Sequence, residues 1–139
     1  MIIRQATLKD LNLILEFMGR RQIRRNDWHI KSKNFIKSYI KNKHNFFFIC
    51  IDNKSIVGSI AGELWDDKGF AYVGEIVVKG KNKEIIINEM FNKFIKFCRN
   101  KKINLINAYV NNSNKKQVMV YKSLGMKKKG NYFYFEKRI

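Results

Sequence analysis

Among the tyrosines and carboxylates of the sequence, Tyr121 and Glu75 are two side chains that could act as an acid and a base at neutral pH. Tyr121 lies in a helix-like run that follows Asn114, and Glu75 lies in a strand-like run. A phenol titrates near pH 10, so it keeps a proton that it can give to a developing anion, whereas a carboxylate can accept a proton from a nucleophile. Tyr121 could equally pack beneath a strand, and Glu75 could be a solvent-facing strand residue. Both are therefore candidates for proton transfer, each with a structural alternative.

The cysteines and histidines do not have the spacing of a metal site. Cys50 lies in a strand-like run and Cys98 in a helix-like run, and neither has a CxxC partner or a neighbouring histidine. His29 and His44 occur in polar stretches without partners at ligand spacing. We predict two buried thiols, two exposed histidines and no bound metal.

The first third of the chain predicts a strand followed by two helices. The strand is expected at residues 2–6, and Thr7 with Asp10 after it is typical of a capping box that opens a helix. The apolar face of this helix is predicted to comprise Leu8, Leu11, Leu15 and Met18. After a basic stretch at 20–27, a second amphipathic helix places on one face Phe35, Ile36, Tyr39 and Ile40.

The middle of the chain predicts an antiparallel meander and a long helix. Strands are expected at 45–52, 55–65 and 70–78, joined by segments of hairpin-turn composition. The next segment, 83–101, has the clearest helical period in the chain, carried by Ile87, Met90, Phe91, Phe94 and Cys98. This helix is expected to cross over to a parallel strand at 103–110.

The C-terminal part predicts a short helix and one or two strands. Asn111 to Asn114 supply helix-capping residues, and Gly125 is expected at the left-handed C-terminal cap. The alternating residues between 126 and 139 are typical of terminal strands.

Length and composition predict one folded domain spanning residues 1–139. The chain is 45% apolar and 14% aromatic, as folded proteins are. Its longest apolar run, 46–51, is far shorter than the roughly 18 to 20 residues that span a bilayer. The N-terminus lacks the sections of a signal peptide. We expect a cytoplasmic protein with no membrane association.

The formal net charge of +18 is large for 139 residues. Such a field attracts phosphates, nucleic acid and other polyanions. Because the chain is rich in Lys, Ile and Asn and has no Pro, the same charge could instead reflect biased coding by A/T-rich codons. Both interpretations stay open at this point.

The element order and one motif resemble the GNAT superfamily of acyl-CoA N-acyltransferases. The segment Asn114-Lys-Lys-Gln-Val-Met-Val-Tyr121-Lys-Ser-Leu-Gly125-Met126 is similar to the family pattern Asn-x-x-Ala-x-x-x-Tyr-x-x-x-Gly-Phe, with departures at Gln117 and Met126. The resemblance covers nearly the whole chain. It implies an α/β (α+β) GNAT fold, in which a mixed, mostly antiparallel sheet of about seven strands has helices on both faces.

The resemblance also implies a cofactor position. In this family the pantetheine arm of acetyl-CoA enters a V-shaped gap between the fourth and fifth strands, where it pairs with backbone groups as an added strand would. The matching backbone positions here are Ile76, Val77, Val78 and Lys79. Asn114 could bond the pantetheine, cap the last helix, or do both.

Catalytic roles follow from the same resemblance. Tyr121 would protonate the departing thiolate of coenzyme A, and Glu75 would accept the proton of the amine. A backbone amide of Val77 or Val78 would polarise the thioester carbonyl. In relatives that acetylate protein N-termini the base occupies the position of Tyr109, which is not a carboxylate here.

The pyrophosphate loop is where the sequence departs most from the family. Relatives have an Arg/Gln-x-x-Gly-x-Gly/Ala pattern, and Asn82 takes the Arg/Gln place here, with Ile85 and Ile87 in the two small-residue places. A helix N-terminus still offers amide donors and the positive end of a dipole. We expect phosphates near Lys83, Glu84, Ile85, Ile86 and Ile87, with a weaker or differently seated cofactor because β-branched residues replace glycine.

The sequence leaves the acceptor, a protein or small-molecule amine, unidentified. Trp28, Tyr39 and Trp65 could line its site or be ordinary core aromatics. The positive field repels cations and so favours a neutral or acidic acceptor. An alternative function is a non-catalytic GNAT-fold module that binds RNA, DNA or a ribonucleoprotein, and the protein is expected to be a monomer or a homodimer.

Overall fold

A computed structural model describes the chain at residues 1–23, 33–110, 113–129 and 134–139. It contains one seven-stranded sheet with the strand order β1-β2-β3-β4-β5-β7-β6. The strands are β1 (Ile2–Gln5), β2 (Asn45–Asp52), β3 (Ser55–Trp65), β4 (Phe70–Val78), β5 (Leu105–Tyr109), β6 (Lys127–Lys129) and β7 (Tyr134–Arg138). The helices are η1 (Leu8–Asp10), α1 (Leu11–Ile23), α2 (Lys33–Lys41), η3 (Asp66–Lys68), α3 (Lys83–Asn100) and α4 (Lys115–Ser123).

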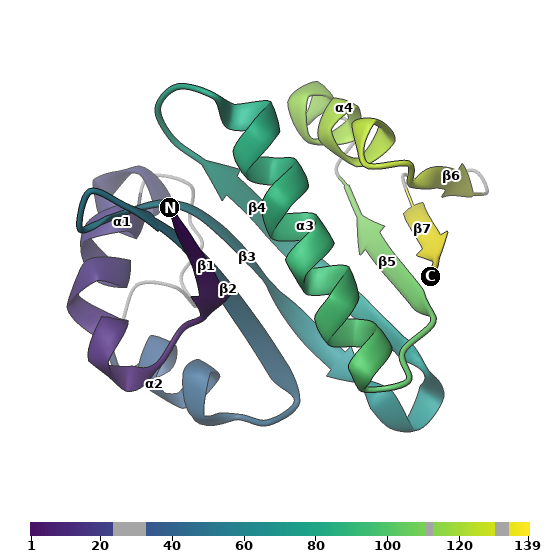
Figure 1. Cartoon of the computed structure of the whole chain (residues 1–139), viewed down its shortest axis with the longest axis horizontal. Coiled ribbons are helices and arrows are strands. Elements are labelled where there is room, and N and C mark those ends of the chain that lie inside the picture. The colour runs from purple at the N-terminus through teal and green to yellow at the C-terminus, as the bar shows by residue number, and fades with distance from the viewer. Residues whose placement is uncertain (24–32, 111–112, 130–133) are drawn as a thin grey trace.

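The sheet is mixed, because β4 and β5 run parallel while the other neighbouring pairs run antiparallel. Helix α3 crosses one face, and α1 and α2 lie against the other (Figure 1). This arrangement confirms the predicted fold class. The three strands predicted at 45–52, 55–65 and 70–78 have these bounds in the structure.

The alternation of side chains along β2 builds the two halves of the core. Phe46 and Phe48 face α3, whereas Phe47 and Ile49 face α1 and α2. Consecutive strand residues point to opposite faces, so a strand covered on both sides reads as a continuous apolar run. The run 46–51 is therefore the central layer of a three-layer structure.

Helix α1 differs from its prediction in phase and length. Leu8 belongs to the short helix η1 and is 40% exposed, so it is not part of the buried face. The residues of α1 that are buried are Leu11, Ile14 and Phe17. Helical residues continue to Ile23, across a break at Gly19. The predicted residues Leu15 and Met18 are partly buried and pack against this cluster, so the centre of the buried face lies about one residue before the predicted one.

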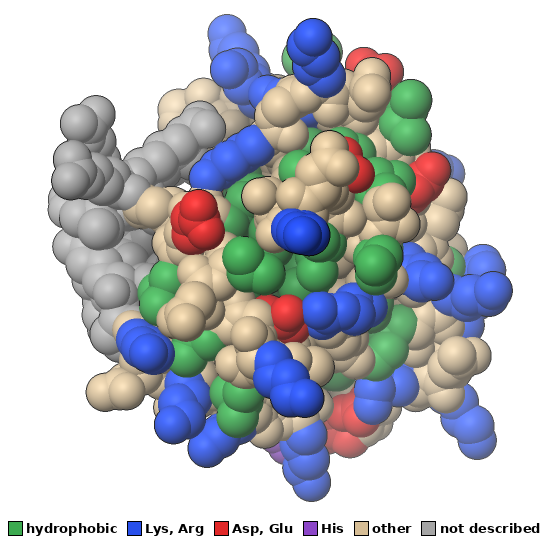
Figure 2. All heavy atoms as spheres, turned by 60° about the vertical axis from the view of Figure 1, so that its left-hand side comes forward, with side chains coloured by type: hydrophobic (Ala, Val, Ile, Leu, Met, Phe, Trp, Pro, Cys, Tyr) green, Lys and Arg blue, Asp and Glu red, His purple; other side chains and the backbone are tan. Residues whose placement is uncertain are grey.

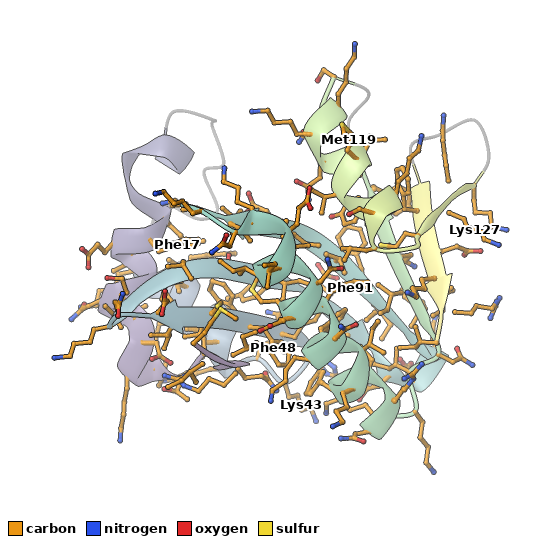
Figure 3. All side chains as sticks on the ribbon, turned by 45° about the horizontal axis from the view of Figure 1, so that its top comes forward. Phe17, Lys43, Phe48, Phe91, Met119 and Lys127 are labelled. Atoms are coloured by element: carbon orange, nitrogen blue, oxygen red, sulfur yellow. The ribbon has the colours of Figure 1, made fainter. Side chains whose placement is uncertain are left out.

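Helix α3 confirms the predicted stripe except at Ile87, which is half-buried while its neighbour Ile86 is buried. Met90, Phe91, Phe94 and Cys98 are buried against the sheet, and Figure 3 shows Phe91 between α3 and the strands. Phe94 stacks on Phe46 of β2, with ring centroids 4.3 Å apart and planes at 28°. Each buried aromatic removes a large apolar area from water, so this stripe fixes the helix on the sheet.

Several smaller predictions fall on single residues. Cys50 and Cys98 are free and buried, and His44 is exposed, as predicted. Trp28 and His29 lie outside the described residues. Gly125 adopts the expected left-handed conformation, with a φ of 76°. Within the described part of the chain, no helix is long and apolar enough to span a membrane, and no group of His, Cys, Asp or Glu has the arrangement of a metal site.

A buried carboxylate ties β1 to the start of α1. Asp10 accepts two hydrogen bonds from the Arg4 guanidinium, at 2.7 and 2.8 Å, and another from the backbone N–H of Thr7 at 2.7 Å. The predicted capping box is thus present. The hydrogen bonds from Arg4 lower the pKa of Asp10 from 3.8 to about 2.

Replacing Phe94 with Ala should lower the free energy of unfolding by about 3 to 5 kcal/mol, because the change leaves a cavity beneath α3. Chemical denaturation monitored by circular dichroism would measure this. Ile85→Ala on the same helix is the control, since Ile85 is 57% exposed and should change stability by less than about 1 kcal/mol. Equal losses in both variants would contradict the observed packing.

Asp10 should make stability depend on pH in the acid range. Its pKa is depressed on folding, so its contribution is complete above the unfolded pKa near 4 and is lost as the pH falls towards 2. Asp10→Asn should remove about 1 to 2 kcal/mol at pH 6, a value reduced because Arg4 is 41% exposed. The deficit relative to wild type should shrink between pH 4 and pH 2, whereas the exposed control Asp52→Asn should show no such change.

Candidate functional site

The ladder between β4 and β5 ends early. Only three pairs join the two strands, and the last of them is Tyr72 with Asn107. Beyond this point β5 continues to Tyr109 and β4 to Val78, but their described residues no longer pair with each other. In Figure 1 the strands lie side by side at their first residues and diverge towards the start of α3. The residues of β4 after Tyr72 therefore present an open edge.

A β-bulge on β4 lies at the point of divergence. Ala61 pairs with Glu75 and Gly62 with Val73, so Gly74 is the extra residue. A bulge bends its strand and increases the local twist, which turns the second half of β4 away from β5. Gly62 is required opposite it, because a Cβ there would lie 1.9 Å from the carbonyl oxygen of Tyr72.

The start of α3 faces the open end of this gap. Its N-cap residue, Asn82, has a φ of 58°, a left-handed conformation that Asn tolerates better than most residues. Lys83 and Ile85 are exposed, the latter by 57%. The first N–H groups of a helix have no partner within it, so this end suits an anion.

Ile86 departs from the predicted cofactor contacts. Its amide donates to the carbonyl oxygen of Asn82 at 3.1 Å, and its side chain is buried in the core beneath α3. Both groups already have partners within the protein, so Ile86 offers none to a phosphate. Lys79 is also engaged, because its ammonium group donates to the carbonyl of Phe17 and lies 4.4 Å from the centre of that ring.

Helix α4 places Tyr121 beside the gap. Asn114 caps this helix by accepting a hydrogen bond from the backbone N–H of Gln117 at 3.2 Å. Met119 points away from the protein in Figure 3 and is 70% exposed, whereas Tyr121 points inward and is 1% exposed. Burial raises the pKa of Tyr121 above its ordinary value, and the charges of Tyr72 and Glu75 raise it further. The phenol therefore remains protonated at neutral pH.

Gln117 stands where the family pattern has alanine. Its carboxamide lies near the Tyr121 phenol and opposes the rise of the pKa that burial causes. Its Nε2 is nevertheless buried without a well-formed hydrogen bond to any described residue. A buried donor of this kind is rare in folded proteins. Only the departure from alanine marked this residue in the sequence.

The sequence profile of the GNAT acetyltransferase domain matches residues 3–137. The chain belongs to the GNAT acetyltransferase family. Solved structures agree on the fold of this GNAT domain. The ribosomal-protein-alanine N-acetyltransferase from Brucella melitensis has a TM-score of 0.75 at 14% identity, with 100% of both chains covered. The PaiA N-acetyltransferase from Thermoplasma acidophilum, solved in complex with coenzyme A, has a TM-score of 0.72 at 20% identity, covering 99% of this chain and 98% of that one.

A third GNAT structure is also similar. A probable acetyltransferase from Staphylococcus epidermidis has a TM-score of 0.75 at 20% identity, covering 98% of this chain and 94% of that one. No curated protein matches the chain by sequence. The similarity of these structures establishes the GNAT fold. At identities this low it does not identify the substrate.

The predicted site residues of this GNAT domain surround the gap from three sides. Ile76, Val77 and Val78 lie on the open half of β4, and the start of α3 lies at its mouth. Tyr121 approaches from α4. Glu75 is half-buried and shares a face of the sheet with Ala61, its cross-strand partner. Asn114 is exposed, and its observed role is that of a helix cap.

Three residues near the gap were missed by sequence reasoning. Asn107 is 9% exposed and its Oδ1 has no hydrogen-bond donor among the described residues. Tyr72 is its cross-strand neighbour, and Glu63 is in turn the neighbour of Tyr72. The available signal was the polar residue Asn107 inside the mostly apolar run 103–110. A buried polar residue of this kind is either hydrogen-bonded within the protein or has a functional role.

Proposed function

We propose that the protein is an acetyl-CoA-dependent N-acetyltransferase that acts on an amine. The observation that carries this proposal is the open edge of β4 after Tyr72, which leads from the amide end of α3 to the buried phenol of Tyr121. An extended ligand can pair with such an edge as a strand would. The PaiA N-acetyltransferase structure, solved in complex with coenzyme A, supports the same use of this fold.

The backbone of β4 would hold the pantetheine arm. Ile76, Val77 and Val78 lie on the half of β4 that β5 leaves open, and their side chains pack into the core. Lys79, predicted as a fourth position, already donates its backbone N–H to the carbonyl of Val57 at 2.9 Å. Specificity for the arm would thus reside in main-chain geometry. Such pairing costs little conformational entropy in the protein, because the sheet already holds the strand in its extended conformation.

The first turn of α3 would hold the phosphates. The amides of Lys83, Glu84 and Ile85 precede the first intrahelical bond, and the ammonium of Lys83 adds a positive charge that the carboxylate of Glu84 partly offsets. Ile86 is not included in this proposed phosphate site, because its amide already donates to the carbonyl of Asn82. Ile87 lies one residue further into the helix and so further from its free amide end.

The residues of the gap would accept and donate the protons of the acetyl transfer. Bound acetyl-CoA supplies the acetyl group as a thioester. Glu75, directly or through water, would take a proton from the acceptor ammonium, because only the neutral amine is nucleophilic. An amide of Val77 or Val78 would donate to the thioester oxygen, and Tyr121 would give its proton to sulfur as the C–S bond breaks.

Calorimetric titration with acetyl-CoA tests the proposal directly. Binding should occur at micromolar to millimolar ligand, and thiol release in the presence of amines should exceed the uncatalysed rate. If millimolar acetyl-CoA neither binds nor loses its acetyl group, the proposed function is wrong.

Lys83→Glu should weaken acetyl-CoA binding by about three- to tenfold, since it reverses a charge beside the proposed phosphate position. The loss should diminish as salt is added, because screening weakens exposed charges. Lys96→Glu makes the same change further along α3, where Lys96 is exposed, and should have little effect. Equal affinities for the two variants would mean that the phosphates bind elsewhere.

Tyr121→Phe keeps the ring and its packing against Phe135, at 5.7 Å between centroids, but removes the phenolic proton. Losing a general acid typically lowers kcat by about 10² to 10⁴. The affinity for acetyl-CoA and the melting temperature should change little. Thiol release by stopped-flow or colorimetric assay measures the rate. A variant with the wild-type rate would identify Tyr121 as a packing residue.

A further inference from the structure

Four polar or aromatic side chains gather on the α1 and α2 face of the sheet, where the β4–β5 ladder ends. Glu63 of β3, Tyr72 of β4 and Asn107 of β5 are successive cross-strand partners, so they share this face. The bulge at Gly74 returns Glu75 to the same face, opposite Ala61. Because neighbours on the diagonal of a sheet lie about 7 to 8 Å apart, the two carboxylates are close without touching.

The central strands are acidic although the protein is strongly basic. Lys and Arg make up 29 of the 139 residues and Asp and Glu only 11. Yet β3, β4 and β5, with 11, 9 and 5 residues, contain no Lys or Arg, and their acidic residues are Glu63 and Glu75. Both carboxylates lie on the α1 and α2 face of the sheet, near the point where β4 and β5 diverge. The charged residues of these central strands are therefore negative, whereas the net charge of the protein is positive.

Asn107 supplies an independent indication of a ligand. It is 91% buried, and its Oδ1 has no donor among the described residues. A carbonyl oxygen in that position needs an N–H or O–H partner. It belongs to the last residue pair before the strands diverge, which is where an acceptor amine and the thioester would meet.

The aromatic residues beside the carboxylates complete a site for a cation. The rings of Tyr72 and Tyr109 lie 5.8 Å apart at 45°. Burial raises the pKa of the Tyr72 phenol, and the charges of Glu63 and Tyr109 raise it further. The pKa of Tyr39 is also raised, first by burial and then by the charge of Glu63, so this carboxylate influences the phenols of both Tyr39 and Tyr72. Aromatic faces attract ammonium groups and pack against methylene chains.

Within the described strands, the basic residues on this face lie on the outer strands β1, β6 and β7, apart from Lys79, which follows β4. Arg138 of β7 is the partner of Leu105, and Lys127 and Lys129 of β6 lie opposite β7. Lys129 forms an ion pair of 3.8 Å with Glu136. Lys79, at the end of β4, is held by Phe17. The basic residues of the described strands therefore lie at the margins of this face or, for Lys79, are held by α1, whereas Glu63 and Glu75 lie on the central strands.

We propose that the acceptor is a small aliphatic diamine or oligoamine that binds as a cation on this face. Its reacting nitrogen is held by Asn107 Oδ1 near Glu75, and its second ammonium lies against Glu63, beside the ring of Tyr72. The inference rests on the proposed acetyltransferase function. The neutral nitrogen forms the C–N bond as the C–S bond breaks, the amine proton passes to Glu75 or water, and sulfur receives a proton from Tyr121.

This inference reverses the expectation that net charge favours a neutral or acidic acceptor. The general field repels a cation at long range and is screened over roughly 8 to 10 Å in physiological salt. Binding is decided at contact, where two carboxylates, an amide oxygen and aromatic faces act over shorter distances. Figure 2 shows Lys and Arg side chains scattered over the visible surface and not gathered into one patch.

The test compares three amines of similar length with saturating acetyl-CoA. Putrescine carries a second ammonium, n-pentylamine ends in a methyl group, and δ-aminovalerate ends in a carboxylate. The kcat/KM for putrescine should exceed that for n-pentylamine by about five- to tenfold and that for δ-aminovalerate by more. Higher activity with n-pentylamine or δ-aminovalerate would overturn the proposal.

Glu63→Gln keeps the shape of the side chain and removes its charge. It should lower kcat/KM for putrescine by about fivefold, mainly through KM, and leave n-pentylamine within about twofold. Glu89→Gln makes the same change at an exposed position on α3 and should leave all three amines unaffected. Asn107→Leu should raise KM for putrescine and n-pentylamine alike, because both lose the acceptor for the reacting nitrogen.

Failure of this inference is distinguishable from failure of the acetyltransferase function. If acetyl-CoA binds but putrescine is neither acetylated nor bound by the complex in calorimetry, the assignment of the acceptor is wrong while the cofactor site stands. If acetyl-CoA does not bind at all, the proposed function fails and the diamine assignment fails with it.

Discussion

The early end of the β4–β5 ladder is the constraint on which the rest of the site depends. Parallel strands normally continue to pair until one of them ends, because each unpaired N–H or C=O in a partly buried sheet is costly. Here pairing ends at Tyr72 and Asn107, and the bulge at Gly74 turns β4 aside. The fold thus keeps an open backbone edge inside its sheet, flanked by α3 and α4 rather than by another strand.

That opening explains why groups from distant parts of the sequence converge. The crossover through α3 brings its amide end to the mouth of the gap, and the return through α4 brings Tyr121 to its interior. On the opposite face, the side-chain Oδ1 of Asn107 has no donor within the described part of the chain, and Glu75 lies beside the apex. A continuous ladder would have closed both approaches. In the proposed function, the two sides of the gap would receive the cofactor and the acceptor separately.

Most of the fold could be predicted from local pattern, because buried strands and the α3 stripe carry strong periodicity. The bounds of β2, β3 and β4 followed from apolar runs between turn residues, and the stripe through Phe94 proved buried. The phase of α1 was wrong because η1 precedes it, and a three-residue helix shifts the face on which Leu8 lies. Sequence pattern alone does not distinguish a tight first turn from an α-helical one.

The site could be predicted only where the family motif covers it. Tyr121 and the open half of β4 followed from the resemblance, and their catalytic roles stay predictions. Asn107 and Glu63 could not be found in this way, because their importance arises from pairing across three strands rather than from neighbours in the sequence. Ile86 was assigned to the cofactor by position, whereas its amide bonds to Asn82. Hydrogen bonds of this kind depend on where the helix begins, which sequence pattern fixes least well.

The isoleucines at the start of α3 are less unfavourable to a phosphate than their number suggests. Ile86 points into the core and Ile87 is half-buried, so neither side chain lies where an anion would approach the helix end. Ile85 alone is well exposed there, at 57%. The left-handed residues, Gly80 and Asn82, precede the helix and turn the chain from β4 into α3. A phosphate can therefore approach along the helix axis, towards the amides of Lys83 and Glu84, while the side chain of Ile85 limits approach from the side.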